Sequence, residues 1–533
     1  MGSFVRSVKV GVLGAAGALL LALGVVVPGS SAVGADTTVA NVTVHDAQAL
    51  PFAPGVLTTP PDAGAWKVSC PADGECVASG AVATAGTPVE HRAFVSVQHL
   101  GVWGPAQLVE FPGDPSFGTD SAWISAFECV APGECVGLGR FDQGTPPVLP
   151  FMVSVTGGVV QSAIWLIVPG PQWLAIDPNS IACTAPGQCV ALGDQMLTTG
   201  AHLPVEWSIT DGLPAPGVPI TLPASLSDPV SPDGNGLDIE CPAAGACVEL
   251  GWAGLGSPTP GQMWVRVQSA GVWGSVQTVA FDPGSVSPTG MLVSGILECW
   301  GVGSCTVIGS VPLVARDGLS APYSAAITGG VLGAPALLAT PGYVDTITWY
   351  VQSATCSGPG ACLASVSGFD TAGSTYAGSA HIEMTDGVWS IPVDFANPRE
   401  GWDSFTWSVS CIRPGSCAVI GYITKVVGGV DESRGVLQIQ RDGVWQQPVV
   451  IGAPAELGDS TDLMALSCVA RGTTCVAVGI AGDGGLVPGE VTSAMLTTMA
   501  DPSNSPTIAP DPGTWAIAQL TEFITPTTPK FTG

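Results

Sequence analysis

Positive charge is scarce in this chain. Its 533 residues include 14 Lys and Arg against 42 Asp and Glu, which gives a formal net charge of −28. A polyanion repels the phosphates of nucleic acids and anionic membrane surfaces, so we expect no nucleic-acid partner. The acidic excess either keeps an extracellular protein soluble or attracts cations and basic partners, and the charge alone does not separate these two interpretations.

Histidine and the common catalytic signatures are also scarce. Five histidines occur, with no H-x-H or H-E-x-x-H pair, and no G-x-S-x-G or P-loop pattern is present. The sequence therefore offers no zinc-protease helix, hydrolase elbow or nucleotide cradle. His91, His99 and His381 are expected at the surface or hydrogen-bonded. After the first 35 residues no long stretch shows a helical period.

The first 35 residues predict a secretory signal peptide. Arg6 and Lys9 precede an apolar run over 10–27, and small residues follow it, with cleavage expected after Ala32 or Ala35. An uncleaved N-terminal anchor is the alternative. We expect a secreted, extracellular protein with no membrane span after cleavage.

Cysteine pairs recur along the whole remaining chain. The first cysteines are 54 to 59 residues apart, and this fixed period indicates a repeat architecture. The pairs are Cys70/Cys76, Cys129/Cys135, Cys183/Cys189, Cys241/Cys247, Cys299/Cys305, Cys356/Cys362, Cys411/Cys417 and Cys468/Cys475.

A second signature lies between the pairs. It reads "GVWGPAQLVEFPG" at 101–113 and returns at 271–284, 387–398 and 443–454, with weaker copies elsewhere. One repeat therefore predicts four strands of about five residues. The first leads into the first cysteine, the second leaves the second cysteine, the third is rich in Val, and the fourth begins at "GVW".

Four antiparallel strands repeated every 40–60 residues are typical of β-propeller blades. The expected fold class is all-β: a propeller of eight four-stranded antiparallel blades, with seven blades plus a divergent terminal unit as the alternative. We divide the chain into a signal peptide (1–35), a single propeller domain (36–525) and a flexible tail (526–533). The segment 43–55 looks like an extra outer strand that helps close the ring, although 513–523 fits the same place.

The cysteine pairs have three interpretations. Disulfides within each pair fit an exported protein with an even cysteine count. Structural zinc needs a shorter spacing and usually nearby histidine, and catalytic redox chemistry needs C-x-x-C. We therefore expect one structural disulfide per blade.

In these two motifs the chain resembles secreted actinobacterial repeat proteins described as Kelch- or galactose-oxidase-like propellers, mostly of unknown function. The similarity covers roughly 40–525. It implies the architecture and little about activity, because the copper ligands of galactose oxidases and the boxes and arginine triad of sialidases have no counterpart here.

Acidic residues recur in the connections between repeats, which lie together on one face of a propeller. Such a rim can bind Ca²⁺ through hard oxygen ligands, or a close pair can act as acid and base on a glycan; alternatively each Asp caps its own turn. No cofactor is required, and Ca²⁺ is the one candidate. The candidate carboxylates are Asp120, Asp233, Asp403 and Asp462.

The 16 tryptophans fall into two groups. Those of the "GVW" strands recur at one repeat position and are expected in the core: Trp103, Trp273, Trp389, Trp445 and Trp515. Trp173, Trp252 and Trp402 fall in or near connections, where exposed indoles stack on sugars or anchor protein partners. These three are the aromatic candidates for ligand contact.

Together these features favour a monomeric, non-catalytic protein that presents a propeller face to a glycan or an extracellular protein. A polysaccharide-acting enzyme with paired rim carboxylates is one alternative, and a structural cell-envelope protein is another. No catalytic residue is assigned.

Overall fold

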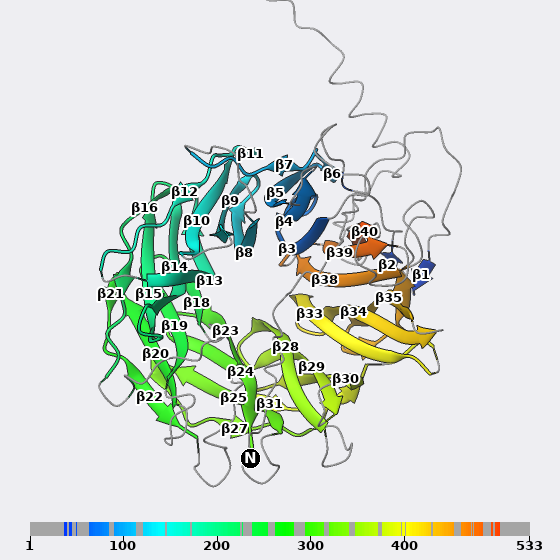
Figure 1. Ribbon diagram of the computed structural model, residues 1–533. Helices are drawn as coiled ribbons and strands as arrows, with labels where there is room; N and C mark the ends of the chain where they lie inside the picture. Colours follow the sequence, from blue (N-terminus) through cyan, green and yellow to red (C-terminus); the bar gives the residue numbers. More distant parts are fainter. Residues whose placement is uncertain are drawn as a thin grey trace, which may run out of the picture.

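The computed structural model describes residues 37–39, 42–44, 50, 63–84, 90–112, 121–143, 147–170, 173–223, 226, 237–253, 262–281, 294–313, 319–340, 347–370, 376–395, 397–399, 401–427, 430–451, 460–470, 472, 474–482, 492–493 and 496–500. Over these ranges the chain forms antiparallel sheets that follow one another around a central opening (Figure 1), and no α-helix occurs in them. This is the predicted all-β propeller.

Each blade has three long strands, called a, b and c from the centre outward. The innermost strands a are β3 (Ala63–Ala72), β8 (Ser121–Ala131), β13 (Trp173–Ala185), β18 (Asp238–Ala243), β23 (Ser294–Gly301), β28 (Ile347–Gly358), β33 (Asp403–Arg413) and β38 (Ser460–Cys468). Strands b are β4 (Glu75–Thr84), β9 (Glu134–Asp142), β14 (Gln188–Leu197), β19 (Ala246–Ala253), β24 (Ser304–Pro312), β29 (Ala361–Asp370), β34 (Ser416–Val427) and β39 (Thr474–Gly482). Strands c are β5 (Glu90–His99), β10 (Leu149–Thr156), β15 (His202–Thr210), β20 (Gln262–Ser269), β25 (Ser320–Thr328), β30 (Tyr376–Thr385), β35 (Val430–Arg441) and β41 (Leu496–Ala500).

The outermost strand d is split into two short pieces in blades 1 to 7. The pairs are β6 (Val102–Trp103) and β7 (Gln107–Leu108), β11 (Val159–Val160) and β12 (Ile164–Trp165), β16 (Leu213–Pro214) and β17 (Val218–Pro219), β21 (Val272–Trp273) and β22 (Gln277–Ala280), β26 (Val331–Leu332) and β27 (Ala336–Leu337), β31 (Val388–Trp389) and β32 (Val393–Asp394), and β36 (Val444–Trp445) and β37 (Val449–Ile451). Short, interrupted edge strands that carry prolines such as Pro214 and Pro219 resist pairing with other chains.

The expected strand length of about five residues is wrong for strands a to c, which run up to 13 residues in β13. Glycines that look like strand breakers in the sequence stay inside the ladder. Gly80, for example, pairs with Ala65 in the middle of blade 1. The pairing therefore continues through the small residues that punctuate the sequence.

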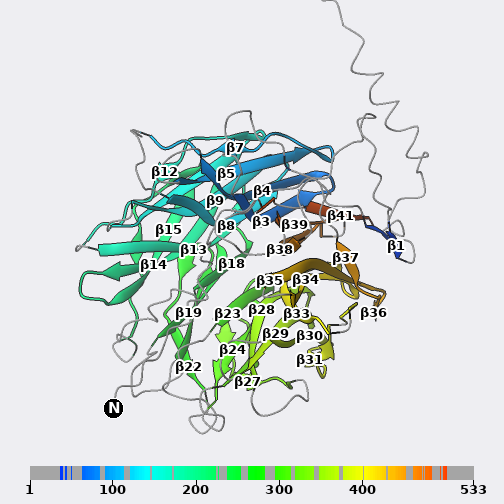
Figure 2. The ribbon, with the colours of Figure 1, turned by 45° about the vertical axis from the view of Figure 1, so that its right-hand side comes forward.

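The ring closes between blade 8 and blade 1. β2 (Val42–Val44), preceded by β1 (Thr37–Val39), pairs antiparallel with β41, with Thr43 opposite Ala500, and so takes the strand d position of blade 8 (Figure 2). A short strand, β40 (Thr492–Ser493), also joins this sheet. The backbone N–H of Cys70 donates to the Ser467 hydroxyl at 3.0 Å, across 397 residues of sequence. The competing segment 513–523 lies outside the described residues.

The hydrophobic core consists of eight apolar clusters, each shared by two neighbouring blades. Between blades 8 and 1, for instance, Val469 and Val476 pack with Phe94 and Trp103. Eight successive interfaces that return to blade 1 define eight blades, so the eight-blade prediction is confirmed over the seven-blade alternative.

All eight predicted disulfides are present, and each joins the end of strand a to the start of strand b. They are Cys70–Cys76, Cys129–Cys135, Cys183–Cys189, Cys241–Cys247, Cys299–Cys305, Cys356–Cys362, Cys411–Cys417 and Cys468–Cys475, with Cα–Cα distances of 3.9–4.1 Å. Closing so short a loop stabilises the fold by about 2 kcal/mol per bridge on the loop-entropy argument. Eight such bridges also fit an oxidising, extracellular compartment.

The second cysteine of every bridge is buried, so the bridges belong to the core and not to a ligand site. Each of these cysteines is at most 6% exposed: Cys76, Cys135, Cys189, Cys247, Cys305, Cys362, Cys417 and Cys475. They belong to the apolar clusters of the blade interfaces, Cys76 to the one between blades 8 and 1 and Cys362 to the one between blades 5 and 6. Because their sulfur atoms are oxidised and shielded, these residues stabilise the fold and are not available as nucleophiles or metal ligands.

Candidate binding site in the central channel

The inner strands carry a β-bulge at the same place in six blades. The pairing with strand b shifts by one residue between the fifth and the third residue before the first cysteine, as between Ile124 and Ala126 in blade 2. In five of these blades strand b carries glycine opposite the bulge, because the backbones nearly touch: a Cβ on Gly479 would lie 1.9 Å from the Asp462 carbonyl oxygen. Blade 6 has Val366 at this place. Bulges re-aim the side chains around them, and here they set the positions that face the channel and the next blade.

Two positions of strand a then tie each blade to the next. We call the residue just before the first cysteine the first belt; its members are Ser69, Glu128, Ala182, Glu240, Glu298, Thr355, Ser410 and Ser467. We call the third residue before that cysteine the second belt; its members are Lys67, Ala126, Ser180, Asp238, Ile296, Ser353, Ser408 and Ala465.

The first belt accepts backbone hydrogen bonds from the following blade. In five blades its side chain receives the N–H of the next blade's first cysteine at 2.8–3.1 Å: Ser69 from Cys129, Glu128 from Cys183, Glu298 from Cys356, Ser410 from Cys468, and Ser467 from Cys70. A serine and a glutamate thus perform the same structural task at equivalent positions.

The second belt repeats this arrangement two residues earlier. Ser180 accepts the N–H of Ile239 at 3.3 Å, and Ser353 accepts that of Val409 at 3.3 Å. Asp238 accepts the N–H of Leu297 at 2.8 Å and the Ser180 hydroxyl at 2.7 Å. Its carboxylate therefore links blades 3, 4 and 5.

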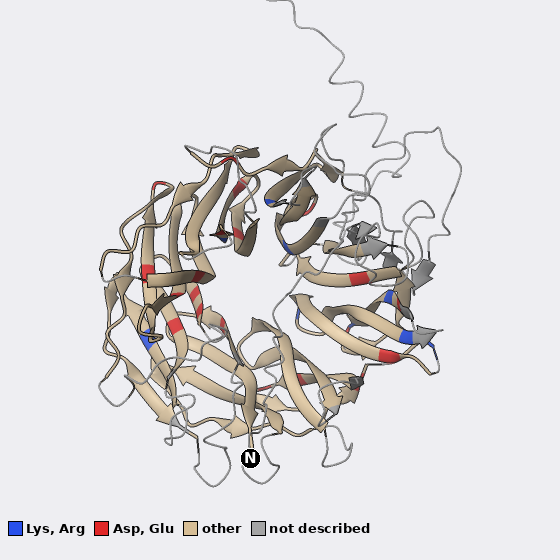
Figure 3. Cartoon of the chain, viewed as in Figure 1, with Lys and Arg blue, Asp and Glu red and all other residues tan. Residues whose placement is uncertain are grey.

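Acidic belt residues gather in blades 2, 4 and 5, and we call Glu128, Asp238, Glu240 and Glu298 the acid arc. Figure 3 shows acidic positions on the innermost strands at the side of the opening formed by β13, β18 and β23. Burial is the main cause that raises the pKa of Glu128 and of Glu298 to about 8, and the neighbouring Asp238 charge raises both further. Asp238 is therefore close enough to repel both Glu128 and Glu298.

Lys67 is the one basic residue of the two belts. Its side chain lies on an innermost strand and is exposed to water. Burial lowers the pKa of its ammonium group, whereas the negative charge of Asp238 opposes this change. Because Lys67 belongs to blade 1 and Asp238 to blade 4, this interaction crosses the channel.

Both belts lie toward the face of the ring that we call the turn face, where strand a turns into b and strand c turns into d. In blades 1 to 7 a glycine N–H of the c–d turn donates to a glycine carbonyl of the a–b turn, as from Gly101 to Gly74 at 2.8 Å. Gly101 has a φ of 79°, and Leu100 before it also has positive φ, so this turn requires the conformational freedom of glycine.

Each c–d turn exposes one aliphatic side chain at the first residue of strand d. We call these seven residues the apolar ring: Val102, Val159, Leu213, Val272, Val331, Val388 and Val444. Their exposed fractions run from 45% for Val102 to 71% for Val272. The next residue in the strand, such as Trp103 at 5%, is turned toward the core instead.

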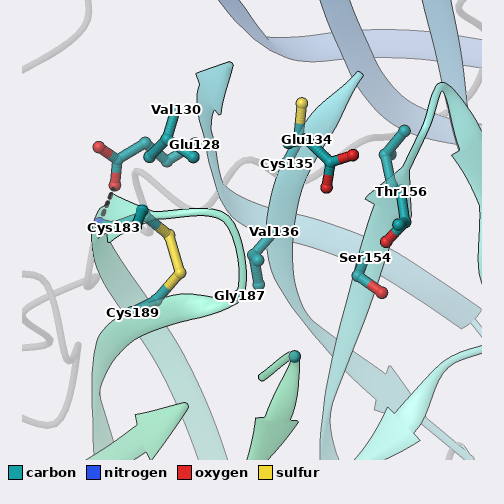
Figure 4. A pocket seen from close by; sticks show the side chains of 13 residues that line it. Glu128, Val130, Glu134, Cys135, Val136, Ser154, Thr156, Cys183, Gly187 and Cys189 are labelled. Carbon is teal, nitrogen blue, oxygen red and sulfur yellow. Dashed lines mark hydrogen bonds between the residues drawn. A yellow bond between two sulfur atoms is a disulfide. The ribbon is translucent and has the colours of Figure 1, made fainter. Parts of the chain in front are cut away.

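A small depression lies on the turn face between blades 2 and 3 (Figure 4). Glu128 and Glu134 line it with Ser154 and Thr156. The Glu128 carboxylate accepts the Cys183 N–H, and Glu134 accepts the N–H of Gly157 at 2.9 Å. Both acids are therefore engaged with backbone, and the depression is part of the blade joint.

The three candidate tryptophans do not form one site. Trp252 is 1% exposed and stacks on Phe281, so its prediction as a surface contact is wrong; strand b continues through this residue and buries it. Trp173 at the start of β13 is half-buried against the core of blades 2 and 3. Trp402 is half-buried, with the Arg399 guanidinium 5.1 Å from its ring centre.

The candidate carboxylates are also separated. Asp120 and Asp233 lie outside the described residues. Asp403 is exposed at the start of β33, and partial burial raises its pKa. Asp462 accepts a hydrogen bond from Ser433 of blade 7, and burial raises its pKa to about 6. In the described part of the rim, Asp462 thus serves as a tie between blades rather than as part of a shared site.

Two further findings concern metals and membranes. Within the described ranges no group of three or more His, Cys, Asp or Glu side chains is arranged to hold a metal ion. None of the described residues belongs to a helix long and apolar enough to cross a membrane.

Sequence reasoning missed the acid arc, although a signal was present. The triplets "FEC", "IEC" and "LEC" place Glu128, Glu240 and Glu298 at one repeat position. The expectation for His381 is also wrong, because this residue is fully buried and neither ring nitrogen has a hydrogen-bond partner in the described part of the chain. Burial lowers its pKa to about 4.

The chain is similar in structure to several solved β-propellers. The propeller domain of the trilobed protease from Pyrococcus furiosus aligns with a TM-score of 0.38 and 9% identity, over 73% of this chain and 99% of that one. An α-L-arabinanase from Penicillium chrysogenum aligns with a TM-score of 0.33 and 12% identity, over 63% and 96%. A neuraminidase-like protein of subtype N11 from a flat-faced bat influenza A virus aligns with a TM-score of 0.31 and 12% identity, over 64% and 92%.

These similarities carry no information on activity. No protein-family model matches the chain, and no curated protein matches it. The resemblance to actinobacterial Kelch-like proteins therefore stays a prediction.

Proposed function

We propose that this protein is a secreted, non-catalytic binding module that presents the turn face of its propeller to a partner in the cell envelope or the medium, with a protein favoured over a glycan. The apolar ring is the observation that carries this proposal. Isolated exposed aliphatic residues are common and need no explanation. Here, however, the exposure recurs at one position in seven consecutive blades.

Folding does not require these side chains. The neighbouring strand d residue fills the core, as Trp103 does, while Val102 remains accessible. The apolar ring lies on the outermost strands and the acidic belt residues lie on the innermost strands, so the turn face offers the mixture of apolar and charged contacts that protein interfaces use. Neutral sugars would instead call for exposed aromatic platforms, and the candidate Trp252 is buried.

The carboxylates support binding rather than acid–base chemistry. Glu128, Glu298 and Asp462 each accept a hydrogen bond from a neighbouring blade. A general acid or base needs an oxygen within reach of the substrate, and these oxygens hold the ring together.

A polysaccharide-acting enzyme is the second candidate because of Glu240 and Glu298. After burial, the charge of Glu298 is the largest cause that raises the pKa of Glu240 well above its usual value. Two carboxyls that hold each other in different protonation states are the arrangement that glycoside hydrolysis uses.

The test is co-sedimentation of the mature protein with cell-envelope fractions and with insoluble polysaccharides, with released sugars followed by mass spectrometry. Serine replaces Val272, Val331 and Val388 in one variant. The control variant replaces Ile167, Leu337 and Val393, which are also aliphatic and exposed, at 44–65%, but lie beyond the turns. We expect the envelope fractions to retain the wild-type protein and the control variant. They should not retain the variant with serine at 272, 331 and 388, and no sugars should be released.

Three results would overturn the proposal. The first is that the envelope fractions still retain the variant with serine at 272, 331 and 388. The second is that no fraction retains the wild-type protein, and the third is that oligosaccharides are released. Release would favour the enzyme and make Glu240 and Glu298 the residues to replace next.

A further inference from the structure

Blade 8 takes its outermost strand from the other end of the chain. β2 pairs with β41 at Thr43 and Val44, in the register that Val102 and Trp103 take on β5 in blade 1. Six residues after Val44, Leu50 is 4% exposed and packs in the apolar cluster between blades 8 and 1. The N-terminal segment therefore follows the course of a strand d as far as Leu50.

The same spacing recurs in the other blades. In blade 1 the buried Val109 lies six residues after Trp103, and its N–H donates to the Ala93 carbonyl of strand c at 2.9 Å. The equivalent residues are at most 4% exposed in four further blades: Leu166, Ile220, Phe395 and Ile451. A buried apolar residue at this position therefore marks strand d.

The sequence contains nine copies of this strand for eight blades. Residues 515–523 read "WAIAQLTEF", and residues 103–111 of blade 1 read "WGPAQLVEF", so six of the nine positions are identical. Residues 44–52, the copy at the N-terminal end, read "VHDAQALPF" and share three of the nine. The C-terminal copy lies outside the described residues, and its sequence matches the strand d pattern of blade 1 better than the copy that is in place.

Blade 8 is fastened to blade 1 by contacts that do not involve strand d. The Ser467 hydroxyl accepts the Cys70 N–H at 3.0 Å, and the Asp73 carboxylate accepts the N–H of Thr474 at 3.1 Å and its hydroxyl at 2.6 Å. β2, in contrast, pairs with β41 over two residues of the described ranges. Because an edge strand with few backbone pairs opens more readily than the strands behind it, strand d of blade 8 can be exchanged while the ring stays closed.

The C-terminal copy is connected closely enough to reach this edge. β41 ends at Ala500, and 13 residues separate it from Thr514, the counterpart of Thr43. An extended stretch of this length spans about 45 Å, whereas the chain has only to reverse its direction, as two residues do between β5 and β6. The four prolines in 501–513 lack the N–H that a ladder requires, which suits a connection rather than a strand. The copy can therefore be laid antiparallel to β41.

We propose that strand d of blade 8 has two occupants, the N-terminal segment 43–52 and the C-terminal segment 513–523, which replace each other on one folded ring. When the C-terminal segment is bound, the N-terminal segment and the residues attached to it are released from the propeller. A chain that still carries residues 1–35 can thus complete blade 8 without that segment. Thr43 and Thr514 hold the same position, the eighth of the apolar ring, so the exchange leaves the turn face unchanged. The device therefore goes beyond the proposed function and does not depend on it.

Hydrogen exchange of the full mature protein, followed by mass spectrometry, tests whether the two segments compete. Leu50→Asp places a charge at a position that is 4% exposed and so weakens the N-terminal occupant. We expect exchange in residues 513–523 to slow by about tenfold or more as that segment takes the position, and Trp515→Asp to slow exchange in 43–52 in return. An unchanged exchange rate of 513–523 in Leu50→Asp would refute the proposal.

Ile451→Asp is the matched control. It makes the same change at the same strand d position of blade 7, where the side chain is 3% exposed and the sequence contains a single copy of the strand. Exchange in 513–523 should not slow in this variant, and slowing in both variants would contradict a competition confined to blade 8. Leu50→Ala should change the exchange rate in the same direction by a smaller factor, which keeps the test valid if Leu50→Asp does not fold.

Sedimentation of Leu50→Asp separates exchange on one ring from exchange between molecules. We expect a monomer in which residues 513–523 are protected. A dimer with the same protection would show that the segment completes a second copy of the chain, and it would overturn the proposal. Retention by envelope fractions should match that of the wild-type protein because the turn face is unchanged, so the exchange and the binding proposal can fail independently.

Discussion

The acid arc and the serine belts on the other side of the channel hold the same backbone groups with different chemistry. In blades 1, 7 and 8, Ser69, Ser410 and Ser467 receive the N–H of the next blade's cysteine. In blades 2 and 5, Glu128 and Glu298 receive the equivalent N–H. A neutral hydroxyl thus suffices for the blade joint, and the charge of the arc is an addition that the joint does not need.

This addition carries an energetic cost. The arc carboxylates are half-buried, and each loses part of a hydration that one backbone hydrogen bond does not restore, whereas a serine hydroxyl loses much less. Residues that reduce stability and are not needed for architecture are expected where the molecule binds or reacts. The two sides of the channel therefore differ in charge while they hold the same backbone groups.

The pH dependence of stability is where the two sides should differ most. In the folded chain Glu128 and Glu298 have pKa values of about 8, above the unfolded value of 4.5. The folded state then keeps protons that the unfolded state has released, so the free energy of unfolding falls as pH rises from about 4.5 to about 8. Each pKa unit corresponds to about 1.4 kcal/mol.

Urea denaturation across this pH range measures the effect. In a variant with Gln at 128, 240 and 298, the free energy of unfolding should fall much less as the pH rises. At the alkaline end this variant should be several kcal/mol more stable than the wild-type chain. A variant with Ala at 69, 410 and 467 should be less stable by a constant amount at all pH values. Parallel curves for wild-type and Gln variant would show that the arc is ionised throughout.

Glycine substitutions opposite the bulge should affect both sides of the ring alike. Gly139→Ala in blade 2 and Gly421→Ala in blade 7 place a Cβ 2.5 Å from the Trp123 carbonyl oxygen and 1.9 Å from the Phe405 carbonyl oxygen. We expect each to destabilise the fold by about 3 kcal/mol through overpacking, measured as the urea midpoint. A much smaller effect in one blade would mean that its bulge does not set the belt.

Removing a disulfide should lower the free energy of unfolding by about 2 kcal/mol both on the acid arc side and on the serine side, because the closed loops have the same length. The pairs to compare are Cys299–Cys305 in blade 5 and Cys411–Cys417 in blade 7. Double serine variants of each pair should show equal shifts in thermal midpoint. Unequal shifts would indicate that the arc depends on its bridges in a way the serine side does not.

The smallest effect is expected at the ring closure. Ser467→Ala removes the acceptor for the Cys70 N–H and should cost about 1 kcal/mol. Ser125→Ala is a useful control, because this hydroxyl also bonds across a blade interface, to the Pro178 carbonyl at 2.6 Å, but away from the closure. Hydrogen exchange in β3 and β38 should rise only in the first variant; similar rises in both would contradict a special role for the closure.

The repeat allowed the architecture to be predicted from sequence, because cysteine spacing and the "GVW" signature act locally and recur in every blade. The disulfides and the core position of Trp103 followed from this. The acid arc did not, because its members are far apart in sequence and only ring closure brings Glu128, Asp238 and Glu298 within electrostatic reach. Trp252 was misplaced because the length of strand b depends on pairing with β20, which no local pattern reveals.

The protonation state of the acid arc tests this account most directly. Infrared titration of the mature protein, compared with the variant carrying Gln at 128, 240 and 298, isolates the carboxyl groups concerned. We predict a protonated carboxylic-acid band at pH 6 that is stronger in the wild-type chain than in the variant, and this difference disappears as the pH passes about 8. A spectrum in which all three glutamates are already ionised at pH 6 would contradict the claim that the folded ring holds mutually repelling carboxyls in its channel.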